Sequence, residues 1–218
     1  MAKPSARRRE PDVTREKLLQ AAFHEIYRHG FQGASLDVIL GKAGVTKGAL
    51  YHHFSDKAEL GRAVVDEVVH GLLLERWLGV LERQPGDSLT ALQGMLKQRA
   101  SELTSHEVEL GCPLNNLAQE MSPLDERFRR RVSATFETWI DGFARVLAKG
   151  QAEGTVRKDV DPRQVAGFLV GALEGCYGLA KSARSKAMLR ANFEVLGSML
   201  DSLRMPPSPR PRPQARHR

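Results

Sequence analysis

The chain has 218 residues, of which 41% are hydrophobic and 27% are charged, so it can bury the core of one large domain or two small ones. No apolar run approaches the roughly 20 residues of a membrane span, which argues against an integral membrane protein. The formal charge of +7 comes from the ends, because residues 1–9 and 204–218 hold nine basic residues and no acid, leaving −2 between them. The high overall charge is therefore weak evidence for nucleic-acid binding by the folded body.

The two ends of the chain and its cysteines further limit which classes of protein fit the sequence. Residues 1–11 are expected to form a basic disordered arm, and residues 205–218, rich in Pro and Arg, a disordered tail. No apolar stretch follows the basic N-terminus, so we expect no signal peptide. Cys112 and Cys176 are too few for a disulfide scaffold and have no zinc-ligand spacing, which fits a reducing cytoplasm.

Apolar residues recur at helical spacing while strand patterns are nearly absent, which predicts an all-α protein. The first helix should begin just after Thr14 and end at Gly30, a residue that adopts a left-handed conformation cheaply. Asp56 and Glu59 form a capping pair for a later helix that should run to about Leu78.

Turn residues and helix-start signals divide the second half of the chain. Pro at a first helical position costs no hydrogen bond, so Pro113 predicts a short helix to about Met121 with Cys112 as its N-cap. By the same signals we expect further helices over residues 88–104, from Ser122-Pro123 to about Gly150, over 162–182 and over 186–203.

Two short helices are predicted before residue 57, over 36–43 and 46–54, with a tight turn at Gly44-Val45. A helix–turn–helix needs a glycine at this turn and apolar residues that lock the two helices together. The second helix leaves small and polar residues exposed at its start, which suits insertion into a DNA major groove. These residues are Thr46, Lys47, Gly48, Tyr51 and His52.

The stretch from Ala43 to Lys57, AGVTKGALYHHFSDK, resembles the DNA-binding signature of the TetR family of bacterial repressors. The resemblance extends from about Thr14 to Leu60 and departs from the usual pattern at Leu40 and Gly41. It implies a three-helix, helix-turn-helix DNA-binding domain over residues 12–57. It also implies a C-terminal helical domain over residues 58–204 that binds an effector and dimerises.

The resemblance also implies which side chains meet DNA. The DNA-binding residues would be Ser35, Thr46, Lys47, Gly48, Tyr51, His52, His53 and Lys57. Tyr and Lys donors to phosphate position such a protein, whereas contacts to base edges specify the sequence. The structural alternatives are a half-buried core role for Tyr51 and a metal pair formed by His52 and His53, although adjacent helical residues point apart.

The last two predicted helices carry apolar stripes, and the first of them also has glycines four residues apart. Each glycine weakens a helix, so the run suggests close approach of another backbone, from the same chain or from a second copy. We expect a homodimer interface, with intrachain packing as the alternative. Its residues would be Phe168, Gly171, Gly175, Leu179, Phe193, Leu196 and Leu200.

Large residues and isolated polar residues of the middle helices mark a candidate pocket for an unidentified small-molecule effector, because a buried polar group must find a partner. The candidates are Cys112, Asn115, Asn116, Phe128, Trp139, Phe143, Glu174 and Tyr177, with ordinary core or surface roles as the alternative. As an N-cap, Cys112 would feel the helix dipole, which would lower its pKa and suit a sensing thiolate. The alternative is a small packed cysteine.

The resemblance to the TetR family, taken together with these patterns, implies a cytoplasmic, homodimeric transcriptional regulator that binds a palindromic double-stranded DNA operator. We expect a repressor that a small-molecule effector releases from DNA. An activator of the same fold and a non-specific nucleic-acid binder are the alternatives. The sequence has no phosphate loop, nucleophile elbow or HExxH motif, so we expect neither an enzyme nor a bound metal or cofactor.

Overall fold

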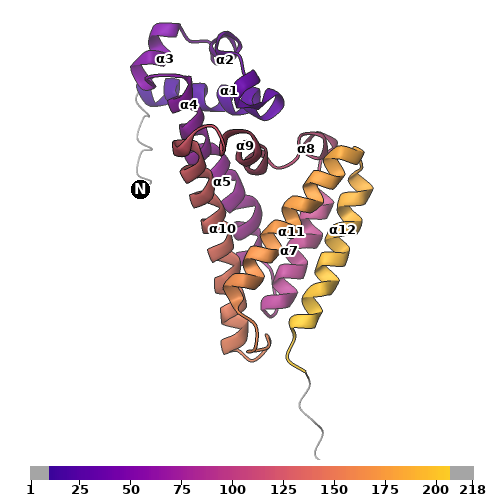
Figure 1. The fold of residues 1–218 in the computed structure, drawn as a ribbon. Helices are drawn as coiled ribbons and strands as arrows, with labels where there is room; N and C mark the ends of the chain where they lie inside the picture. The colour runs from indigo at the N-terminus through magenta and orange to yellow at the C-terminus, as the bar shows by residue number, and fades with distance from the viewer. Residues whose placement is uncertain (1–9, 207–218) are drawn as a thin grey trace, which may run out of the picture.

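The computed structural model describes residues 10–206, and every regular element among them is a helix, as the all-α prediction required (Figure 1). Residues 1–9 and 207–218, which hold most of the expected arm and tail, lie outside the described residues. The first helices form one end of the molecule, and the longer helices run away from it (Figure 1). That end comprises α1 (Glu10–Gly33), α2 (Leu36–Ala43), α3 (Lys47–His53) and α4 (Lys57–Ala63).

A continuous helical path leaves this end at α4 and continues to Glu82, past the expected end at Leu78. Two stretches of it are π-helical, in which hydrogen bonds close over five residues; the N–H of His70 donates to the carbonyl of Val65. The segments after α4 are η1 (Val64–Val69, π), α5 (His70–Leu73), η2 (Leu74–Gly79, π) and α6 (Val80–Glu82).

The remaining helices build the body of the protein, in which α10 packs on α11, and α12 packs on both α11 and α7. They are α7 (Ser88–Glu102), α8 (Ser105–Leu110), α9 (Pro113–Met121), α10 (Glu126–Ala152), α11 (Pro162–Ala183), α12 (Lys186–Met199) and the short 3-10 helix η3 (Leu200–Leu203). The starts of α7, α9, α11 and α12 are those the sequence predicted.

Two predicted helix starts were wrong. α1 already includes Glu10, upstream of the expected start after Thr14, because Pro11 is tolerated in the first turn of a helix. α10 begins at Glu126 and not at Ser122-Pro123. The carboxylate of Asp125 caps this later start by accepting hydrogen bonds from the backbone N–H groups of the second and third residues of α10, at 2.7 and 3.1 Å.

Aromatic rings form the centre of the body. The ring of Trp77 on η2 lies 5.0 Å from that of Trp139 on α10, 6.4 Å from Tyr177 on α11 and 6.2 Å from Phe193 on α12, measured between centroids. Tilted and edge-to-face pairs at these distances are favourable beyond the area that they bury. One aromatic cluster therefore ties four helices together.

The C-terminal end of the described chain is attached to the body. Arg204 donates to the carboxylate of Asp87 at 2.9 Å, and the N–H of Met205 donates to the carbonyl of Thr155 at 3.0 Å. Met205, which the sequence placed at the start of the disordered tail, therefore belongs to the packed structure.

Candidate DNA-binding surface and effector cavity

The helix–turn–helix has capping groups at each of its joints. The hydroxyl of Ser35 accepts the N–H of Val38 at the start of α2, at 3.4 Å, and the hydroxyl of Thr46 accepts the N–H of Ala49 at the start of α3, at 3.2 Å. Gly44 has φ +66° between the two helices, the left-handed conformation that favours glycine. These local groups determine where α2 ends and α3 begins, and Ile39 of α2 and Leu50 of α3 anchor both helices in the common hydrophobic core.

The start of α3 faces solvent at the end of the molecule farthest from the long helices (Figure 1). Tyr51 is 49% exposed, so about half of its side chain is accessible for contacts with DNA. The exposed candidates are Thr46, Lys47, Gly48, Tyr51 and His52. Together they form a surface of hydroxyl, ammonium, phenol and imidazole groups around a helix N-terminus, which suits phosphate and base-edge contacts.

The other candidate DNA contacts are half-buried: Ser35, His53 and Lys57. The ammonium of Lys57 donates to the carbonyl of Gln32 at 3.2 Å and lies 5.0 Å above the ring of Phe31. Lys57 therefore helps to hold α4 against the end of α1. Among residues 10–206 no group of three or more His, Cys, Asp or Glu side chains could hold a metal ion.

A carboxylate from the body holds a break in α1. At Gly30 the backbone turns out of the helix, with φ +75° and ψ 167°, before helical geometry resumes to Gly33. Glu120, near the end of α9, accepts the freed N–H groups of Phe31 and Gln32, each at 2.8 Å. Its carboxylate acts as a cap supplied from a distant helix, and it fixes the direction in which the chain enters α2.

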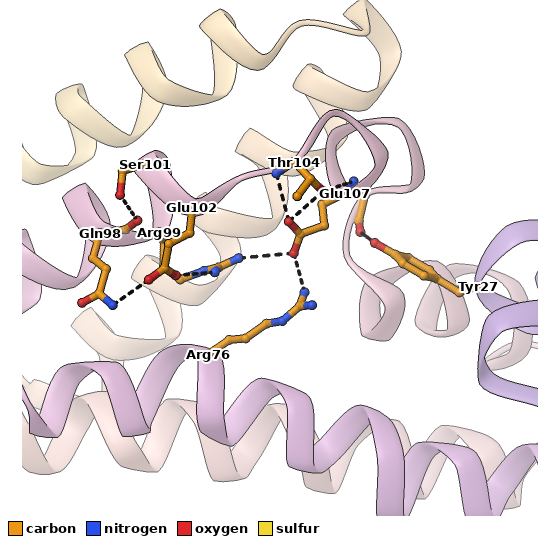
Figure 2. Close-up of polar contacts among 9 residues, drawn as sticks. Tyr27, Arg76, Gln98, Arg99, Ser101, Glu102, Thr104 and Glu107 are labelled. Carbon is orange, nitrogen blue, oxygen red and sulfur yellow. Dashed lines mark hydrogen bonds and ion pairs between the residues drawn. The ribbon is translucent and has the colours of Figure 1, made fainter. Parts of the chain in front are cut away.

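Further contacts join the DNA-binding end to the body close to this cap. The hydroxyl of Tyr27 on α1 donates to the carbonyl of Gly111 at 2.5 Å (Figure 2). Arg62 on α4 pairs with Asp125 at 3.2 Å. Because the partners precede and follow α9, that helix lies at the centre of the connection.

A small cavity of about 20 Å3 lies where α1, α5, η2, α7, α8, α9 and α11 meet. That is room for about one water molecule. Its lining residues are Tyr27, Leu72, Leu73, Arg76, Trp77, Arg99, Glu107, Gly111, Cys112, Pro113 and Tyr177.

Two arginines in the cavity wall converge on one carboxylate (Figure 2). Arg76 lies 2.8 Å and Arg99 3.6 Å from Glu107, and Arg99 also pairs with Glu102 at 3.0 Å. Burial alone would raise the pKa of Glu107, but the N–H of Thr104 and the two arginines lower it overall. The charges of these arginines are therefore already balanced within the chain.

The predicted pocket residues separate into three groups. Cys112 and Tyr177 line the cavity. Asn116 is held outside it by bonds to the carbonyl of Leu110 at 2.8 Å and to Lys181 at 3.1 Å, while Asn115 lies beside Glu174. The three remaining large candidates, Phe128, Trp139 and Phe143, are buried in the core and do not line it.

The expected low pKa of Cys112 is wrong. Cys112 does occupy the N-cap of α9, but its side chain makes no capping hydrogen bond. Desolvation by burial, together with the nearby Glu174 carboxylate, raises the pKa of its thiol well above the ordinary value, and the N–H groups of α9 oppose this only in part. The thiol is therefore the small packed cysteine that the sequence left as the alternative.

Glu174 is the unusual polar group of this region. It is 8% exposed, and neither carboxylate oxygen has a hydrogen-bond partner among the described residues. Desolvation raises its pKa to about 7, while the neighbouring Cys112 and Asn115 oppose that rise. A carboxyl group in this position changes charge near neutral pH.

The predicted dimer residues fall on two different faces. Phe193, Leu196 and Leu200 are buried in the chain's own core, because the aromatic cluster takes that face of α12. The α11 candidates, Phe168, Gly171, Gly175 and Leu179, are exposed. A side chain added at Gly171 or Gly175 would meet nothing within 4 Å, so the backbone there is bare.

The neighbouring helix α12, which packs on α11, also exposes apolar side chains. They are Met188, Val195 and Met199, which the sequence analysis did not include. We call the exposed residues of both helices the α11–α12 face: Phe168, Gly171, Gly175, Leu179, Met188, Val195 and Met199. No helix among residues 10–206 has the length and apolar character to cross a membrane.

The family model "Bacterial regulatory proteins, tetR family" matches residues 18–64, and the model "Tetracyclin repressor-like, C-terminal domain" matches residues 88–196. An uncharacterized HTH-type transcriptional regulator of Lactococcus lactis is 30% identical over 192 residues, 87% of this chain and 94% of that protein. The HTH-type transcriptional repressor DhaR of Mycobacterium sp. strain GP1 is 27% identical, covering 80% of this chain and 86% of DhaR. The crystal structure of regulatory protein TetR from Rhodobacter sphaeroides has a TM-score of 0.75 at 26% identity, covering 85% of this chain and 98% of that one.

Proposed function

The chain belongs to the TetR family of DNA-binding transcriptional regulators, and we propose that it is a cytoplasmic repressor that binds a palindromic operator as a homodimer and leaves DNA when a small-molecule effector binds. The exposed start of α3 carries the DNA-binding part of this proposal, because capped joints hold it at the end of the molecule. Similarity to the repressor DhaR supports repression over activation. We propose no enzymatic activity.

The homodimer would form through the α11–α12 face. Bare backbone at Gly171 and Gly175, beside the exposed side chains of Phe168 and Leu179, lets a second helix approach closely. Exposed apolar patches of this kind mark interaction surfaces. A two-fold dimer would then present two α3 helices to one face of DNA.

The effector would act through α9, which has the cavity at one end and the DNA-binding end at the other. Cys112 and Pro113 line the cavity at its start, and Glu120 holds the break in α1 near its end. A ligand that moves α9 would therefore move α1, and with it the spacing of the two α3 helices. Binding would favour the dimer geometry that no longer matches DNA.

Selection of binding sites from random DNA with the purified protein tests the proposed function. We expect a two-fold symmetric site with half-sites about one helical turn or more apart. An asymmetric half-site bound by a stable monomer would contradict the proposal. Equal competition by random DNA would instead indicate a non-specific binder, and a reporter whose expression falls when the regulator is deleted would indicate an activator.

Lys47→Ala should weaken operator binding about tenfold at matched salt and reduce the salt dependence by about one counterion, because the exposed ammonium at the start of α3 is placed to contact DNA. Fluorescence anisotropy at several salt concentrations measures both quantities. Lys97→Ala removes an exposed lysine of α7 and should change neither. Unchanged affinity in Lys47→Ala would remove this residue from the proposed contacts.

Glu120→Ala should lower operator affinity by about tenfold, because two backbone N–H groups at the break in α1 lose their acceptor and the orientation of α2 and α3 is no longer fixed. Amide exchange at Phe31 and Gln32 should become faster. Glu120→Gln keeps one carbonyl acceptor, so its operator affinity should lie between those of the wild type and Glu120→Ala. Glu109→Ala, at an exposed position of α8, is the control. Normal affinity together with faster exchange would show that the cap does not position the DNA-binding end.

A further inference from the structure

A second pocket lies where the DNA-binding end meets the body. It has a volume of about 460 Å3, and its wall is formed by residues of α1, α2 and α8. That volume suits a small organic ligand, unlike the cavity of about 20 Å3 at the start of α9. Because α1 and α2 belong to the DNA-binding end and α8 to the body, a ligand here would contact both parts of the chain. We call it the α1–α8 pocket.

Basic and imidazole side chains gather in the wall of this pocket. Five exposed side chains there can donate hydrogen bonds: His24, Arg28, His29, Lys42 and His106. The guanidinium of Arg28 has no ion-pair or hydrogen-bond partner within residues 10–206. The three imidazoles are not arranged as a metal site, since no group of three such ligands in that part of the chain could hold an ion. These donors from separate helices favour an anion.

The carboxylate in this wall is already paired. Glu25 is 4% exposed, and it accepts a hydrogen bond from the ammonium of Lys42 at 2.8 Å. Lys42 lowers the pKa of Glu25, and the backbone N–H of Ser35 acts in the same direction, although burial opposes both. Glu25 therefore stays ionised and ties α1 to α2. Its charge is balanced by Lys42, which leaves the charge of Arg28 uncompensated.

We propose that the α1–α8 pocket binds a small, multiply charged anion of the phosphate-ester or polycarboxylate type, and that its occupation weakens operator binding. Arg28 would hold the anion through paired N–H donors, with His106 on α8 as a donor from the body. The site is separate from the cavity at the start of α9, so the inference goes beyond the proposed function.

The connection to DNA binding runs through Lys42. Its side chain is 50% exposed and lines the pocket, so a bound anion competes with Glu25 for the ammonium. Loss of that bond loosens α2 from α1, and α3 follows α2 across the turn at Gly44. By linkage, operator DNA should lower the affinity for the anion by the same factor as the anion lowers the affinity for DNA.

Calorimetric titration of the full chain with inorganic pyrophosphate and with citrate, at pH 7 and constant ionic strength, tests the site. We expect one anion bound per chain. Arg28→Gln should reduce its affinity at least tenfold, because a charge-assisted pair is lost. Arg145→Gln, at an exposed position of α10 outside this pocket, is the matched control and should bind normally. Tighter binding of pyrophosphate would identify a phosphate ligand, and tighter binding of citrate a polycarboxylate.

Fluorescence anisotropy with operator DNA tests the effect on function. Saturation with the tighter-binding anion should lower the operator affinity of the wild type about tenfold relative to chloride at equal ionic strength, a coupling in the usual range for two linked sites. Arg28→Gln should bind the operator equally well with and without the anion, since it no longer holds the ligand.

Four results would overturn the inference. They are no saturable binding of either anion, unchanged binding in Arg28→Gln, loss of binding in Lys47→Ala, and operator affinity unaffected by a saturating anion. The third would place the anion on the DNA-contacting surface of α3 instead. The titrations contain no DNA, so they decide the existence of the site independently of the proposed repressor function.

Discussion

Leu179→Asp is expected to convert the protein to a monomer and to lower operator affinity more than 100-fold. Leu179 is 61% exposed on α11 beside the bare backbone of Gly175, so in the proposed dimer its side chain would be buried against the partner. Burying a carboxylate there without a counter-charge is strongly unfavourable, so the dimer should dissociate. A monomer contacts one half-site of the operator where a dimer contacts two, which lowers the operator affinity. Analytical ultracentrifugation gives the oligomeric state, and anisotropy gives the affinity.

Leu124 offers a matched control for this substitution. It is also 61% exposed, but it lies in the turn between α9 and α10 and not on the α11–α12 face. Leu124→Asp should therefore remain a dimer with normal DNA affinity. A dimer that survives Leu179→Asp would place the subunit interface elsewhere on the molecule.

Glu174→Gln is expected to stabilise the protein at pH 8 by about 3 kcal/mol while changing its stability much less at pH 5. The pKa of Glu174 rises from 4.5 to about 7 on folding, so its proton favours the folded state below pH 4.5, and that contribution is lost as the pH rises through 7. A tenfold change in the proton affinity of one group corresponds to about 1.4 kcal/mol of folding free energy. Glutamine stays neutral and avoids the loss.

Urea denaturation at the two pH values measures this effect as the difference between variant and wild type, which cancels the titration of other carboxyl groups. Those groups act in the opposite direction: Glu67 and Asp125, for example, have lowered pKa values because of Arg15 and of backbone N–H groups respectively. Glu194→Gln, at an exposed position of α12, should show no such pH dependence. A difference between Glu174→Gln and wild type that does not change with pH would mean that Glu174 is already paired in solution.

The helix–turn–helix was predictable because its determinants are local. Ser35 and Thr46 cap helices that begin one residue later, and Gly44 makes the turn by its own conformation. Each signal acts within four residues, and none depends on distant packing. The sequence accordingly located α2 completely and α3 to within one residue at each end.

The connection between the two parts could not be predicted in this way. Glu120 meets Phe31 and Gln32 across almost 90 residues of chain, and nothing near Glu120 in the sequence distinguishes it from a surface acid. Gly30 predicted a left-handed conformation that ends α1. The structure instead has a break at Gly30, after which α1 continues to Gly33, and a carboxylate from α9 caps this break. Tertiary contacts decided which of these two structures formed.

Burial explains the errors in the C-terminal half. A helical stripe shows that one face is apolar but not what covers it, so Phe193 and Leu196 suited a dimer interface as well as the core that they occupy. For Cys112 the local rule, a lowered pKa at a helix N-terminus, was outweighed by desolvation and by the nearby Glu174. Both outcomes depend on neighbours that are remote in the sequence.

The π-helical segments between α4 and α6 affect how the length of the chain can vary in evolution. A π turn closes over one residue more than an α turn, as the bond from His70 to Val65 does in η1. Loss of one residue within Val64–Val69 or Leu74–Gly79 can therefore be absorbed by a return to α-helix, with the flanking turns keeping their phase. Trp77 could keep its place in the aromatic cluster through a deletion in η1. In an ordinary α-helix the same deletion would rotate it by about 100°.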